Sequence, residues 1–411
     1  MGRGRGRGKV QPMKTIRRHL LFRIILFLPV VLVFLCILGF GLSALSNRVL
    51  PSHSAATDRL GDLDKARAAE ALHLRRELGD ALWPGWGATD IPMIFYNEDY
   101  AFLIGLSDPP AGWLKIPEFE SRGGPWEAVP DDTFEGEGYY RQPLASAGAT
   151  PEAFIVRIGD RWVSNLLTAD WMEIHLGNEF RGMLPPLLQS ILPYRFAARA
   201  FLSVTGGHDL YICAALHESF HAYEAILAQD RLLTAETVYN RNATRYPFDN
   251  SVFAADWQME LDLLADAVQA GSDAETDERT RRFLDRREKR RTAMNLDAAL
   301  IDLERLKEWE EGLAKYTELA IWRLASEDAN YKPLPVMDGD PGFTDYSNFE
   351  QIWLQQIQQI RSMAKGDGDT RFYYSGLAQA VILDRLAPGW RTRILAEKVW
   401  LEDLLKEAVQ G

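Results

Sequence analysis

One segment near the N-terminus constrains this chain more than any other. Residues 24–45 read IILFLPVVLVFLCILGFGLSAL and contain no charged side chain. A helix of about 20 apolar residues is long enough to cross the hydrocarbon core of a bilayer, which is about 30 Å thick. We therefore expect residues 24–45 to form a transmembrane helix, with the lipid bilayer as a partner.

The charges that flank this segment predict its orientation. Residues 1–23 contain many Arg and Lys side chains and no acidic one, whereas Arg48 is the only charge just after the apolar run. Positive charge is retained on the cytoplasmic side, so residues 1–23 are expected to form a cytoplasmic tail. Because the apolar regions of cleaved signal peptides are shorter, an uncleaved anchor is favoured. The expected location is the cell membrane, with a single span and an extracytoplasmic domain.

The charge and cysteine content exclude two further classes. The formal net charge is -12 although the N-terminal tail is basic, so the rest of the chain is strongly acidic. An acidic surface does not neutralise phosphates, and no nucleic acid partner is expected. There are two cysteines, Cys36 in the apolar run and Cys213, so a disulfide framework in the domain is excluded.

The order of predicted elements indicates the fold class. Residues 46–82 are polar and helix-prone, and are expected to form a stalk or linker helix. Residues 83–175 are rich in Pro, Gly and aromatic residues and predict strands, whereas residues 180–411 predict mainly helices. Strands followed by helices are typical of an α+β domain, here residues 83–411.

Two details of this domain are open to test. The best strand candidates are residues 91–103 and 154–167, and Gly159 with Asp160 predicts a hairpin turn inside the second. Residues 154–167 are a candidate edge strand for binding a peptide by strand addition, or else a strand of the sheet core. The highly charged run at 275–291 favours a solvated helix.

The strongest chemical signal is HESFH at residues 217–221, inside the apolar helical pattern DLYICAALHESFHAYEAIL. His217 and His221 are four positions apart, so a helix places both imidazoles on one face, the spacing that one zinc ion needs. Glu218 is rotated by about 100° and is placed to act on a metal-bound water without being a ligand. We expect a Zn²⁺ cofactor and Glu218 as general base. The alternative is two structural histidines on an amphipathic helix.

A catalytic zinc ion normally has three protein ligands, so one more is required. No histidine follows His221. A carboxylate from a later helix is therefore favoured over His175 or His208. Glu260 in WQMELDLLADAV is one candidate. Glu311 in EWEEGLAKYTEL is the other, where the small residue after it would let this helix approach the metal helix closely.

The two motifs together resemble those of the gluzincin metallopeptidases, in particular the aminopeptidase N branch. In that family, HExxH is followed by a segment with the pattern Trp-x-x-Glu-Gly-x-Ala. The matching residues here are Trp309, Glu311, Gly312 and Ala314, and Trp309 is one residue closer to the glutamate than in the family pattern. The resemblance implies a zincin-like helical region and Glu311 as the third ligand. The 90 residues between His221 and Glu311 far exceed the family spacing, so a helical insertion that carries Glu260 would have to loop out.

These features predict a membrane-anchored zinc metallopeptidase that hydrolyses peptide or protein substrates. A donor for the developing oxyanion is also needed, and Tyr316, Tyr373 and Tyr374 are candidates, with Tyr316 and Tyr374 taken first. Two alternatives remain. One is a zinc hydrolase with a non-peptide substrate, and the other is a non-catalytic, membrane-anchored envelope protein with a structural or vestigial metal site.

Overall fold

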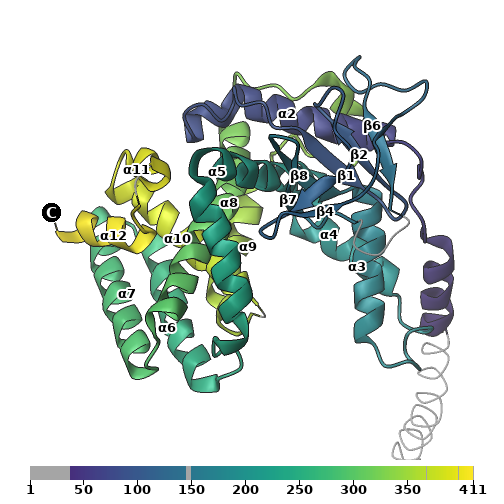
Figure 1. Ribbon diagram of the computed structural model, residues 1–411. Coiled ribbons are helices and arrows are strands. Elements are labelled where there is room, and N and C mark those ends of the chain that lie inside the picture. The colour runs from purple at the N-terminus through teal and green to yellow at the C-terminus, as the bar shows by residue number, and fades with distance from the viewer. Residues whose placement is uncertain (1–37, 145–149, 367, 397, 411) are drawn as a thin grey trace, which may run out of the picture. The chain divides into compact units, whose positions relative to one another are not determined.

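The computed structural model describes residues 38–144, 150–366, 368–396 and 398–410 (Figure 1). They form two compact units, one made of the chain up to residue 52 with 173–200, and one of 53–172 with the chain from residue 201. The expected tail at 1–23 and most of the expected span at 24–45 lie outside the described residues. Within the described part of the chain, no helix is both long and apolar enough to cross a bilayer.

The smaller unit contains a helix over residues 38–49 and parts of α3 (Ala169–Met183) and α4 (Tyr194–Thr205). Hydrogen bonds at the end of the helix over residues 38–49 join it to the segment between α3 and α4. The Asn47 side chain donates to the Leu192 carbonyl at 2.7 Å, and Arg195 donates to the carbonyls of Asn47 and Leu50. These bonds attach the loop between α3 and α4 to the residues that follow the apolar run.

The larger unit contains one mixed sheet with the strand order β4-β3-β7-β8-β1-β2-β6-β5. The neighbours β1 and β8 run parallel, and the other described neighbours are antiparallel. The strands are β1 (Met93–Tyr96), β2 (Tyr100–Ile104), β3 (Trp113–Lys115), β4 (Glu120–Arg122), β5 (Glu127–Ala128), β6 (Tyr140–Pro143), β7 (Phe154–Ile158) and β8 (Arg161–Leu167).

Turn chemistry divides the two predicted strand regions into hairpins. Between β1 and β2 the Asn97 side chain accepts from the amides of Asp99 and Tyr100, a local bond that ends the strand. Between β7 and β8 Gly159 has φ +58°, so the predicted turn is confirmed. The edge-strand prediction for residues 154–167 is wrong, because β7 lies between β8 and β3, which pairs through Leu114 and Lys115.

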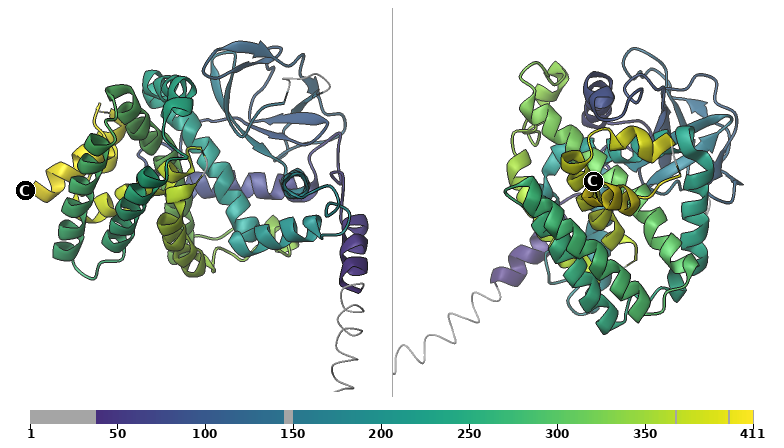
Figure 2. Two further views of the ribbon diagram at one scale, coloured as in Figure 1. Left: turned by 90° about the horizontal axis from the view of Figure 1, so that it is seen from below. Right: turned by 90° about the vertical axis from the view of Figure 1, so that its left-hand side faces the viewer.

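The rest of the larger unit is mainly helical, which confirms the α+β class. The helices are α2 (Asp62–Leu82), α5 (Gly207–Asn242), α6 (Ser251–Val268), α7 (Asp273–Ala293), α8 (Ala298–Glu327), α9 (Phe349–Ser362), α10 (Thr370–Leu386), α11 (Trp390–Ala396) and α12 (Leu401–Gln410). Figure 2 shows the strands at one end of this unit and α6, α7 and α12 at the other. The helix α5 packs against β8 on one side and α8 on the other.

The expected linker is part of the folded domain. Its helix α2 packs against α5 and α8, and Ala71 and Leu74 are completely buried. Glu70, also buried, accepts hydrogen bonds from the hydroxyls of Tyr331 and Tyr346. The prediction of a stalk over residues 46–82 is therefore wrong for α2, because most of its Ala and Leu side chains are buried against the rest of the domain.

The expected solvated helix is also partly buried. On α7 the side chains of Arg287, Arg290 and Arg291 are at most 5% exposed. They form ion pairs with carboxylates on three other helices, namely Glu260 on α6, Glu304 and Glu308 on α8 and Glu402 on α12. Charge composition predicted solvent exposure for this run, whereas matching charges from distant segments allow its burial.

Candidate metal centre

The first two donors of the centre lie on α5. The chain is uncharged from Leu210 to Leu216, and this part of α5 is buried between the sheet and α8. Asp209 in the first turn accepts from the amides of Thr344 and Tyr346 and places negative charge at the positive end of the helix dipole. His217 and His221 follow one turn apart, with their Nε2 atoms 3.2 Å from each other.

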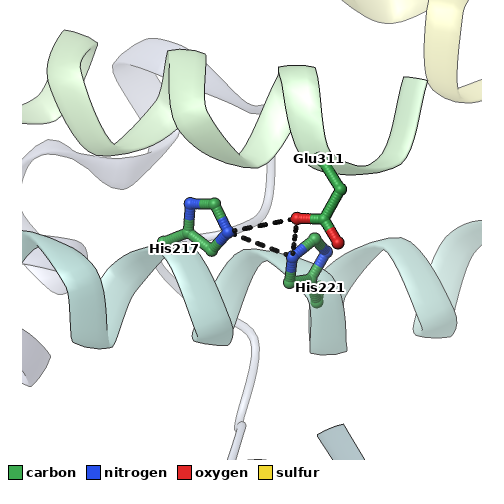
Figure 3. A group of neighbouring side chains, drawn as sticks. All are labelled: His217, His221 and Glu311. Carbon is green, nitrogen blue, oxygen red and sulfur yellow. Dashed lines mark hydrogen bonds and ion pairs between the residues drawn. The ribbon is translucent and has the colours of Figure 1, made fainter. Parts of the chain in front are cut away.

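The helix α8 supplies the third donor (Figure 3). Glu311 Oε2 lies 3.5 Å from His217 Nε2 and 3.4 Å from His221 Nε2. Bonds of about 2.0–2.1 Å from zinc to N or O separate the corners of a tetrahedron by roughly 3.3–3.4 Å. The three donor atoms therefore have the spacing of three corners of a tetrahedral zinc site.

The two oxygens of Glu311 differ in a way that fits a metal ligand. Oε1 accepts a hydrogen bond from Lys307 Nζ at 3.2 Å. Oε2 is buried and has no hydrogen-bond donor, although it faces two ring nitrogens. A buried carboxylate oxygen without a donor is costly, and coordination of a cation removes that cost.

Two further carboxylates lie beside the Nδ1 atoms of the histidines, and that of Glu224 makes a hydrogen bond. Glu224 Oε2 lies 2.9 Å from Nδ1 of His221, and Glu318 Oε2 lies 3.3 Å from Nδ1 of His217. Such an acceptor holds the proton on Nδ1 and leaves the Nε2 lone pair for a metal. Sequence reasoning missed both roles. The sequence feature that could have indicated them is helical spacing. Glu224 is one turn beyond His221, and Glu318 is two turns beyond Glu311.

Carboxyl groups outnumber basic side chains around this centre. The described carboxylates that interact here are Glu218, Glu224, Glu236, Glu310, Glu311, Glu318 and Asp369, and the cations are Lys307, Lys315 and Arg231. Burial raises the pKa of Glu224 and that of Glu310 well above the usual range. Burial opposes protonation of His217, but the neighbouring carboxylates of Glu311 and Glu318 raise its pKa to about 10. The surroundings thus favour an added cation.

Glu218 is the residue next to the first ligand, and it is only half-buried. Burial raises its pKa to about 8, a rise that the His217 ring opposes and the charges of Glu311 and Glu318 support. A divalent cation bound by the three donors would lower that pKa. Its position, beside the ligands but not among the three donors, is the one expected for a general base.

The structure separates the three tyrosine candidates. Tyr373 on α10 stacks on the His217 ring, with centroids 5.8 Å apart and an interplanar angle of 9°, and its hydroxyl hydrogen-bonds Glu311. The Tyr316 hydroxyl instead donates to Asp384 at 2.7 Å and accepts from Arg391, which corrects its predicted role. Tyr374 is half-buried. Burial raises its pKa, which the charge of Lys315 lowers and the charge of Glu318 raises. Tyr373 is therefore the tyrosine at the donor group.

The other ligand candidates are engaged elsewhere. Glu260 is completely buried and accepts from Arg287 and Arg290, so its prediction as a third donor is corrected. His208 Nδ1 lies 2.5 Å from Asp340, and His175 pairs with Glu179 at 3.9 Å. Among the described residues the donor group consists of His217, His221 and Glu311.

The chain between the donors forms the expected insertion. After α5 the helices α6 and α7 run out and back as a hairpin, and α8 then returns to α5 (Figure 1). This geometry reconciles the long gap with a compact donor group. Phe154 at the start of β7 contacts the His221 ring, with centroids 5.0 Å apart.

Comparison of the chain with protein-family models, with curated proteins and with solved structures finds no match. The assignment of function therefore depends on the geometry of the donor group and on the sequence around it.

Proposed function

We propose that this chain is a zinc-dependent metallopeptidase that acts on peptide or protein substrates and is anchored by residues 24–45 in the cell membrane. One observation carries the proposal. The Nε2 atoms of His217 and His221 and Oε2 of Glu311 are 3.2–3.5 Å apart, and the carboxylate of Glu218 follows directly on the same helix.

A zinc ion held by these donors would supply Lewis acidity and lower the pKa of a coordinated water towards about 7. Glu218 would take a proton from the attacking water and pass it to the leaving amine, a role that requires a carboxylate beside the donor group. Glu224 and Glu318 keep both imidazoles in the tautomer that presents Nε2. Tyr373, stacked on the His217 ring, would donate its hydroxyl hydrogen to the oxyanion in place of Glu311.

The helical arrangement also supports a zincin-like interpretation. The HExxH helix packs against a mixed sheet, and a glutamate from a later helix completes the donor group. The anchor follows from the uncharged run at 24–45 and the basic residues before it. It would place the larger unit on the extracytoplasmic side.

Metal content tests the centre. The full-length chain in detergent is compared with Glu311→Gln and Glu260→Gln by plasma mass spectrometry, with circular dichroism to establish folding. We expect one zinc per wild-type chain, loss with Glu311→Gln and retention with Glu260→Gln. A folded, zinc-free wild type would show that the metal centre is vestigial and overturn the proposal.

Peptide hydrolysis tests the reaction. Wild type and Glu218→Gln are assayed on a library of quenched fluorescent peptides. We expect Glu218→Gln to retain zinc and lose about 10²–10⁴-fold in rate, the usual contribution of a general base. A zinc-loaded wild type that cleaves no peptide, but hydrolyses an ester or amide probe in a Glu218-dependent manner, would favour the non-peptide hydrolase instead.

A further inference from the structure

The loop between α3 and α4 is unusually apolar for an exposed segment. Residues 183–194 read MLPPLLQSILPY and contain no charge. The side chains of Met183 and Leu187 are 76% and 83% exposed, and Phe196 just beyond the loop is 57% exposed. Exposed apolar side chains that occur singly are ordinary, but a contiguous group of them marks an interaction surface.

The backbone of this loop satisfies many of its own hydrogen bonds. The Leu188 amide donates to the Pro185 carbonyl at 2.8 Å, and the amides of Ile191 and Leu192 donate to the Leu188 carbonyl. The Gln189 side chain donates to the Leu184 carbonyl at 3.0 Å. Pro185, Pro186 and Pro193 have no amide hydrogen to satisfy. A backbone bonded in this way tolerates an environment with little water.

Charged and aromatic residues lie at the two ends of the loop. Arg181 is exposed at the end of α3, and its guanidinium lies 5.9 Å from the centroid of the Tyr194 ring. Arg195 approaches the same ring at 5.8 Å. Basic residues and tyrosines beside an apolar surface are typical of the boundary between hydrocarbon and headgroups.

Within the same compact unit, this loop is bonded to the end of the apolar N-terminal segment. Asn47 donates to Leu192, and Arg195 donates to the carbonyls of Asn47 and Leu50. The helix over 38–49 exposes apolar side chains of its own, including Phe40 and Leu42. The loop is thus fixed where the proposed span ends, at the level of the outer headgroups.

We propose that residues 183–196 form a membrane-contact loop that dips into the outer leaflet beside the span. This inference depends on the anchor proposed above. The lipid bilayer fits better than a protein partner, because the surface continues an apolar segment, has no charge over residues 183–194 and ends in residues suited to the headgroup region. The loop would hold the smaller unit against the membrane in addition to the span.

Spin-label accessibility tests this loop. Full-length chain is reconstituted at one copy per lipid nanodisc, with single labels at Leu187→Cys, at native Cys36 and at Leu354→Cys. The last is a matched control, because Leu354 is also an exposed leucine, 61% exposed on α9. The chains with Leu187→Cys or Leu354→Cys also carry Cys36→Ser. Cys213 is buried and is kept in every labelled chain. Accessibility is measured to oxygen, which concentrates in lipid, and to a water-soluble nickel chelate.

We expect the ratio of oxygen to nickel accessibility to be several-fold higher at position 187 than at position 354, and highest at Cys36. A water-like ratio at 187 with a lipid-like ratio at Cys36 would overturn the loop and leave the anchor intact. A water-like ratio at Cys36 would remove the anchor and the loop together. Protection of 187 only when two copies share a disc would identify a protein interface and also overturn the proposal.

Discussion

Glu318 Oε2 lies 3.3 Å from Nδ1 of His217, two helical turns beyond Glu311 on the same helix α8. One helix thus provides one member of the candidate donor group and a carboxylate that approaches a second member on α5. We expect Glu318→Gln to weaken zinc binding about 10–100-fold, because the His217 ring loses a charged acceptor. Competition with a chromogenic chelator measures the affinity.

Glu327→Gln is the control for this experiment, since Glu327 lies on α8 and is exposed. We expect its zinc affinity to equal that of the wild type. An unchanged affinity in Glu318→Gln would mean that the 3.3 Å approach contributes nothing to the orientation of His217.

Two neighbouring tyrosines on α10 are expected to behave differently. Removal of the hydroxyl in Tyr373→Phe should lower kcat roughly 10²–10³-fold with zinc content unchanged, because one donor to the oxyanion is lost. Tyr374→Phe should retain activity. Steady-state kinetics with a cleaved peptide checks both variants, and an equal loss in both would remove the specific role of Tyr373.

The crossing of α8 and α10 depends on two glycines without side chains. Gly312 directly follows Glu311 on α8. A Cβ at Gly312 would lie 2.5 Å from Cα of Gly376 on α10. The small residue was expected to face the metal helix, but it meets α10 instead. We expect Gly312→Ala to lower the free energy of unfolding by about 1–3 kcal/mol, the usual cost of overpacking, and to weaken zinc binding.

Urea denaturation of the zinc-loaded chain measures this cost. Gly271→Ala is the matched control, because a Cβ there meets no atom within 4 Å. It should change stability by no more than about 0.5 kcal/mol. If Gly312→Ala were equally neutral, the helices would have room to separate.

The buried charge cluster predicts a loss of stability in acid. Burial opposes ionisation of Glu304, but Arg290 and Arg291 lower its pKa to about 2, against about 4.3 in an unfolded chain. A lowered carboxyl pKa stabilises the fold above the unfolded value, and that stabilisation is lost as the pH falls from about 4.5 towards 2. The full shift corresponds to roughly 3 kcal/mol.

Glu304→Gln tests this dependence. At pH 7 it leaves two buried arginines short of a partner and should cost about 3–5 kcal/mol. Below about pH 4 the difference from wild type should shrink, because Glu304 takes up a proton in the unfolded wild-type chain before it does in the folded one. Unfolding by urea across this range, with exposed Glu288→Gln on α7 as control, measures the trend. A difference that stays constant with pH would contradict the assignment.

The parts of the centre that sequence analysis predicted follow from local periodicity. Four-residue spacing places His217 and His221 on one face of any helix, so their proximity needs no tertiary information. Glu311 was expected because of the segment around it, and the structure brings it to the histidines. The fold class likewise follows from the order of strands and helices along the chain.

The parts that were not predictable depend on partners far away in sequence. Arg291 on α7 is buried because Glu402, 111 residues later, pairs with it, and composition alone describes such a run as solvated. The helical pattern of residues 180–411 is interrupted where Asp297 accepts from the Leu300 amide and starts α8. The choice among Tyr316, Tyr373 and Tyr374 depends on which helix face meets α5, which only tertiary packing decides.

The hairpin of α6 and α7 has a consequence for the order of events in synthesis. It separates His221 from Glu311 by 90 residues, so a growing chain presents two donors well before the third. A pair of imidazoles without a carboxylate holds zinc weakly. Lys307, which donates to Glu311 Oε1, also lies after the hairpin. The hairpin thus acts as a delay, because the proposed hydrolytic centre has its three donors only after α6 and α7 have been made.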